Sequence, residues 1–100
     1  MTYLDLAAEE VRRQVPENVL PDGDTELLFR LYAVLLLAKG ADVTTADVHN
    51  AWSAWMQTTH PDHQSLRPFE ELDPETQAAD EPYAEAIRAA SRARTPRSPS

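Results

Sequence analysis

The sequence predicts an all-α fold, a compact bundle of four to five helices with an irregular, proline-containing loop before the last two. Apolar residues recur at helical spacing in several segments, and residues that typically start a helix precede these segments. No segment alternates apolar and polar residues over a strand-like length. One hundred residues hold a single core, so we expect one domain over residues 1–94. Residues 95–100 lack apolar anchors and contain two prolines, which predicts a disordered tail.

The first predicted helix runs from about Leu4 to Val15. Thr2 and Asp5 have the spacing of a capping box, in which each side chain bonds the backbone of the other residue. Pro16 follows and disfavours the helical conformation in the residue before it. We therefore expect the helix to end there.

The second predicted helix spans residues 25–39 and is apolar around most of its circumference. A turn over residues 21–23 and a capping Asp24 precede it, and Gly40 should end it. Such a helix is either central to the core or contacts another subunit along one flank. Leu28, Leu35 and Leu36 cannot all point into one small core, so we expect some of them to mediate self-association.

Three further helices are expected in the second half of the chain. Thr44 and Asp47 again have capping-box spacing, ahead of a third helix over residues 45–58. Asp73 and Pro74 should start a short helix, and Asp80 a last one over residues 81–94. Their expected apolar faces are Val48, Ala51, Trp52, Trp55 and Met56 in the third helix, and Tyr83, Ala86, Ile87 and Ala90 in the last.

Composition excludes several classes of partner. The net charge of −8 repels nucleic acid, and no Lys or Arg occurs from residue 41 to residue 65, so we expect no DNA binding. The longest apolar run, Leu31 to Ala38, is far shorter than the roughly 20 residues of a membrane span. Without a signal peptide pattern or any cysteine, the chain is expected to be cytoplasmic and to bind no membrane.

The polar candidates for chemistry favour structural roles. His60 and His63 flank Pro61-Asp62 in a loop, whereas zinc sites need three or four converging ligands, so we expect local hydrogen bonds and no metal. Ser53 and Ser65 lie outside the contexts that activate a nucleophile. We expect neither an enzyme nor a cofactor.

One aromatic group has the composition of a ligand platform. Trp52 and Trp55 lie near His49, Arg67 and Phe69 in sequence. Aromatic faces with a guanidinium suit a planar ligand or an anchor residue of a protein partner. The alternative is that both tryptophans complete the core.

The same region resembles a known family, the RyR domain, a repeat named after ryanodine receptors and also found in bacterial and phage proteins. The resemblance covers about residues 46–90. It rests on His49-x-x-Trp52, His60-Pro61, Leu66-x-Pro68-Phe69-x-Glu71-Leu72 and Gln77-x-x-Asp80.

The resemblance implies a non-enzymatic recognition module in a bacterial or phage signalling or defence setting, with a nucleotide-like small ligand. The implied ligand-binding residues are His49, Trp52, Trp55, Arg67 and Phe69. The alternative function is a protein-interaction adaptor or a self-associating protein that uses the apolar face of the second helix.

Overall fold

The computed structural model describes residues 2–20 and 25–94, and within them every regular element is a helix. The α-helices are α1 (Tyr3–Gln14), α2 (Glu26–Lys39), α3 (Thr45–Met56), α4 (Pro74–Ala78) and α5 (Glu81–Arg94). Short 3-10 helices, η1 (Glu17–Val19), η2 (Gly40–Asp42) and η3 (Phe69–Glu71), lie between them. The all-α prediction is confirmed.

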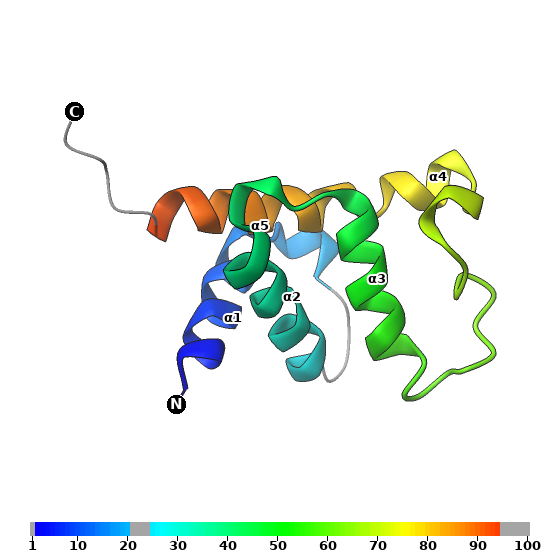
Figure 1. Ribbon diagram of the computed structural model, residues 1–100, viewed down its shortest axis with the longest axis horizontal. Coiled ribbons are helices and arrows are strands. Elements are labelled where there is room, and N and C mark those ends of the chain that lie inside the picture. The colour runs from blue at the N-terminus through cyan, green and yellow to red at the C-terminus, as the bar shows by residue number, and fades with distance from the viewer. Residues whose placement is uncertain (1, 21–24, 95–100) are drawn as a thin grey trace.

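Three helices form a layer that α5 crosses (Figure 1). The second helix, α2, lies between α1 and α3, and α5 contacts all three. The loop after α3 and the short α4 extend beyond α3, on the side away from α1. This arrangement places the predicted proline-containing loop next to α3 and at one end of the bundle.

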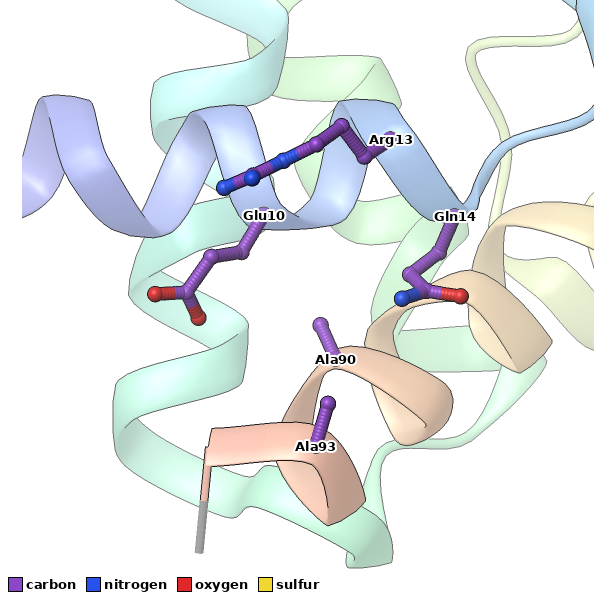
Figure 2. A pocket seen from close by; sticks show the side chains of 5 residues that line it. All are labelled: Glu10, Arg13, Gln14, Ala90 and Ala93. Atoms are coloured by element: carbon purple, nitrogen blue, oxygen red, sulfur yellow. The ribbon is translucent and has the colours of Figure 1, made fainter.

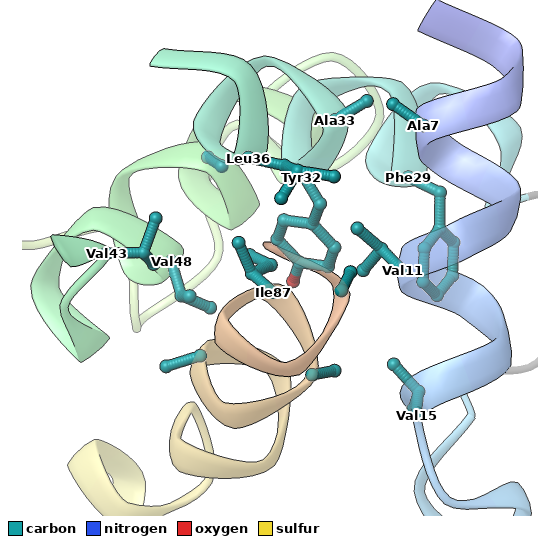
Figure 3. Packing of buried hydrophobic residues seen from close by; sticks show 14 of the residues in the cluster. Ala7, Val11, Val15, Phe29, Tyr32, Ala33, Leu36, Val43, Val48 and Ile87 are labelled. Carbon is teal, nitrogen blue, oxygen red and sulfur yellow. The ribbon is translucent and has the colours of Figure 1, made fainter. Parts of the chain in front are cut away.

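The core lies where α1, α2, α3 and α5 meet (Figure 3). Its largest fully buried side chains are Tyr32, Phe29, Leu28 and Ile87. The rings of Phe29 and Tyr32 are perpendicular, with centroids 5.6 Å apart. Together with the smaller Ala and Val residues around them, these side chains bury apolar surface, which is the main favourable contribution to folding.

Three helices, α1, α3 and α4, begin directly after the residues that were predicted to cap them. The backbone N–H of Asp5 donates to Thr2 Oγ1, and that of Asp47 donates to Thr44 Oγ1, at 3.2 and 3.1 Å. Each aspartate accepts a hydrogen bond in return, so both capping boxes are complete. Asp73 caps α4 by accepting from the backbone N–H of Thr76 at 2.7 Å. The predicted turn at residues 21–23, the Asp24 cap and the tail over residues 95–100 lie outside the described residues.

The third helix is shorter than predicted. It ends at Met56 and not at Thr58. The hydroxyls of Thr58 and Thr59 donate to the carbonyls of Trp55 and Met56, at 2.7 and 3.4 Å. Such local bonds from β-branched hydroxyl residues compete with continuation of a helix.

The leucines that α2 leaves exposed are not among those expected to mediate self-association. Leu28 and Leu36 are buried and Leu35 is half-buried. The large apolar residues that α2 exposes are Leu27, Val34 and Leu37. Each step along a helix rotates the side chain by about 100°, and only the positions of α1, α3 and α5 decide which direction is buried. Among the described residues no helix has the length and apolar composition of a membrane span.

Candidate functional site

His49 is a buried polar residue of α3, with 2% of its surface exposed. Its Nε2 atom lies 2.6 Å from the carbonyl oxygen of Arg67. A carbonyl oxygen only accepts hydrogen bonds, so Nε2 carries a proton and donates it. This bond ties the loop after α3 to the helix.

The other ring nitrogen of His49 faces Asp80, at the start of α5. The Nδ1 atom and the Asp80 carboxylate are 3.8 Å apart, which is beyond hydrogen-bond distance. Burial raises the pKa of Asp80 to about 6, while the electrostatic effect of His49 acts in the opposite direction. The ionised form of this carboxylate is therefore incompletely compensated by its surroundings.

Three of the residues predicted for the site come together here. The rings of His49 and Trp52 are stacked, with centroids 5.6 Å apart, and the Phe69 ring lies 6.2 Å from that of His49. His63 meets the edge or face of Trp52 in a perpendicular arrangement at 5.1 Å. The amide of Gln77 donates to the carbonyl of Phe69 at 2.8 Å, and so holds η3 in place.

The other two predicted site residues lie elsewhere. Trp55 packs against the core, as Trp52 also does, which agrees with the alternative role considered for both tryptophans. The Arg67 residue is exposed, and its backbone carbonyl oxygen accepts the hydrogen bond from His49. Hydrogen bonds from Thr76, together with the nearby charge of Arg67, hold the pKa of Asp73 below its ordinary value.

A cavity of about 180 Å³ opens beside His49 and Trp52. Ser65, Thr76, Ala79 and Asp80 complete its lining. Pockets for drug-sized ligands usually measure about 300–1,000 Å³, so this cavity suits a small chemical group. The last four residues were not among the predicted site residues. Asp80 was interpreted as a helix cap and as part of the Gln77-x-x-Asp80 pattern, and its closeness to His49 depends on how α5 packs.

A second cavity, of about 250 Å³, lies between α1 and α5 (Figure 2). Glu10, Arg13 and Gln14 project from α1 above Ala90 and Ala93 of α5. None of the predicted site residues lines it. Since Ala93 lies next to the last described residue, we assign no site to this cavity.

Ser53, His49 and Asp80 superficially resemble a nucleophilic triad. Ser53 Oγ lies 3.4 Å from His49 Nε2. A general base must accept the proton of the nucleophile through a free lone pair. Here Nε2 is already protonated and donates to the carbonyl of Arg67, so His49 does not activate Ser53.

The loop histidines make local hydrogen bonds, as predicted. His60 Nδ1 lies 2.9 Å from Thr59 Oγ1, and the backbone N–H of Ser65 donates to His63 Nδ1 at 3.0 Å. Within residues 2–20 and 25–94, no group of three or more His, Asp or Glu side chains is arranged to hold a metal ion.

Comparison with known proteins corrects the family interpretation. Searches of curated proteins and of solved structures gave no match. A family model described as Domain of unknown function (DUF7701) matches residues 2–92, and no RyR domain is found. The RyR resemblance was therefore wrong.

Several residues that suggested the resemblance have structural roles here. His49 anchors the backbone at Arg67, and Leu72 is buried. The matched region includes α1 and α2, which the RyR interpretation left out. The chain belongs to the DUF7701 family.

Proposed function

We propose that this chain is a non-enzymatic protein-interaction module that pairs with a second copy of itself through α2. The observation that carries the proposal is the exposure of Leu27, Val34 and Leu37, at 45%, 49% and 43% of their surfaces. Large apolar side chains gathered on one exposed element are typical of an interaction surface.

The exposed apolar side chains of α2 lie on one face of the helix, beside the exposed Arg30. Leu27, the half-buried Leu31, Val34 and Ala38 recur at the i, i+4, i+7, i+11 spacing of a single stripe. We call these four residues, with the flanking Leu37, the α2 face. Because α1 and α3 flank α2 and its opposite side packs on α5, the α2 face points away from the core. Burying one large aliphatic side chain contributes about 1.5–3 kcal/mol.

Charge favours a second copy in antiparallel orientation. Glu26 lies at the first turn of α2 and Lys39 at the last, and within the chain they pair with Arg30 and Asp47. An antiparallel pair centred between Leu31 and Val34 brings Glu26 of one copy opposite Lys39 of the other, at both ends of the contact. The dipoles of the two helices are antiparallel in this arrangement, so their interaction is favourable. A two-fold contact of this kind closes on itself and forms a dimer.

Sedimentation equilibrium of the full chain tests the proposal with a matched pair of variants. Val34→Ser removes an apolar side chain from the α2 face, and Leu6→Ser removes one of nearly equal exposure, 50%, from α1. We expect the parent and Leu6→Ser to form dimers with similar dissociation constants. We expect Val34→Ser to weaken the dimer about 10-fold or more. A monomeric parent, or equal weakening by both variants, contradicts the proposal.

Nucleotide-like ligand binding, expected from the aromatic residues, stays a prediction. The cavity beside Trp52 measures about 180 Å³, and the Arg67 side chain is not part of its lining. Both observations favour a ligand group smaller than a nucleotide.

A further inference from the structure

The cavity beside His49 offers groups that attract positive charge. Trp52 contributes an indole ring to its lining, Asp80 a carboxylate, and Ser65 and Thr76 hydroxyl groups. Cations are attracted to the faces of aromatic rings, and carboxylates and hydroxyls accept hydrogen bonds from ammonium and guanidinium groups. No Lys or Arg is among the residues that line this cavity.

Within residues 2–20 and 25–94, the Asp80 carboxylate has no ion-pair partner at hydrogen-bond distance. Its side chain is 14% exposed, and His49 Nδ1, which is cationic only when both ring nitrogens are protonated, lies 3.8 Å away. Burial, and to a smaller extent the charge of Asp80, raises the pKa of both Tyr32 and Tyr83, and neither tyrosine supplies positive charge. A carboxylate that is partly removed from water loses hydration free energy. Pairing with a bound cation compensates for part of that loss.

We propose that this cavity binds the head of an alkylguanidinium or alkylammonium group, with Asp80 as counter-ion and Trp52 as aromatic wall. A volume of about 180 Å³ accommodates one such head group and a short stem. The group belongs either to a small free amine or to a basic side chain of another protein. The net charge of −8 raises the local concentration of either.

Binding should strengthen as the pH rises from 5 to 7.5. The titrating groups around the cavity are Asp80, His49 and, beside Trp52, His63. Ionisation of Asp80 adds negative charge to the cavity, which favours a bound cation.

The experiment follows the indole N–H signal of Trp52 in ¹H–¹⁵N spectra of the full chain at constant ionic strength. The probes are methylguanidinium and n-butylammonium, with sodium acetate and AMP as anionic comparisons. We expect saturable shifts with the two cations only. Asp80→Asn should weaken binding about 10-fold or more, while Glu75→Gln, a change at an exposed carboxylate on α4, should leave it unchanged.

Equal binding by parent and Asp80→Asn, no saturable shift with either cation, or stronger binding of an anion overturns the proposal. Titrating the parent alone at pH 5 and 7.5 gives a second test: affinity for methylguanidinium that does not rise with pH also overturns it. An acetylated arginine amide distinguishes the sources, because tighter binding than methylguanidinium supports a protein side chain and equal or weaker binding supports a free amine.

Discussion

The hydrogen bond from His49 Nε2 to the carbonyl of Arg67, at 2.6 Å, joins α3 to a loop 18 residues further along the chain. It accounts for a buried histidine without invoking catalysis or metal binding. A part-buried carbonyl that loses its donor costs up to about 1–3 kcal/mol. His49 therefore helps to attach the loop over residues 63–72, together with the hydrogen bond from the Gln77 amide to the carbonyl of Phe69.

Replacing His49 with Phe should lower stability and loosen the loop. The aromatic ring is retained, but the donor to the Arg67 carbonyl is lost. We expect a loss of about 1–3 kcal/mol, and each kcal/mol should lower the Tm by about 4–8 °C. Thermal unfolding measures the loss of stability, and hydrogen exchange over residues 63–72 measures the loosening of the loop.

The matched control, His60→Phe, changes an exposed histidine and should alter stability by less than about 0.5 kcal/mol. Equal effects from both variants contradict this role for His49.

Gly40 should not tolerate a side chain. Its φ is 57° and its ψ is −125°, a conformation that residues with a Cβ avoid. A Cβ atom added there would also lie 2.9 Å from Ser91 Oγ. We expect Gly40→Ala to cost about 1–3 kcal/mol in chemical denaturation.

The two causes are separable with Ser91→Ala, which removes the contacting oxygen. Gly40→Ala should cost less in the Ser91→Ala background than in the parent, and the remainder measures the backbone strain. If Gly40→Ala changes the free energy of unfolding by nearly zero in both backgrounds, the prediction that position 40 does not tolerate a side chain is wrong.

Asp80 should make the protein less stable as pH rises through the weakly acidic range. Burial raises its pKa in the folded protein from the ordinary 3.8 to about 6. Because the folded state binds this proton more tightly than the unfolded state, its contribution to stability is greatest below 3.8 and is lost as pH rises through about 6. Asp80→Asn should remove that decline.

The measurement is urea unfolding of parent and Asp80→Asn between pH 4 and 7. The stability of the parent relative to the variant should decrease with rising pH; a constant or increasing difference contradicts the assignment. Asp5 and Asp73 affect stability in a lower pH range than Asp80 does, because hydrogen bonds from Thr2 and Thr76 lower their pKa values. Their stabilisation is present above 3.8 and is lost as pH falls below it.

Local sequence signals predicted much of the fold. Thr2, Thr44 and Asp73 cap the helices they were expected to cap, because capping depends on residues only three positions apart. The apolar spacing of α5 likewise identified Ala86, Ile87 and Ala90 as buried. These features need no knowledge of the rest of the chain.

Contacts between distant elements were harder to predict. Some of Leu28, Leu35 and Leu36 were expected to lie outside the core, yet Leu28 and Leu36 are buried and Leu35 is half-buried. The helix is apolar around most of its circumference, so its sequence does not show which side meets α5. Asp80 joins the cavity only because α5 packs beside α3. The candidate site was therefore predicted in part: His49, Trp52 and Phe69 come together, while the Arg67 side chain does not join the cavity.

Cysteine cross-linking along the α2 face tests the antiparallel dimer most directly, because the chain contains no cysteine of its own. In the proposed register, the two copies of residue 34 are offset along the helix axis by about 4.5 Å, and those of residue 27 by about 16 Å. Disulfides need Cα atoms within about 7 Å. We predict that Val34→Cys forms a disulfide-linked dimer on mild oxidation of the folded protein and that Leu27→Cys does not. Efficient cross-linking at both positions would indicate a parallel pair, and its absence at residue 34 would contradict association through the α2 face.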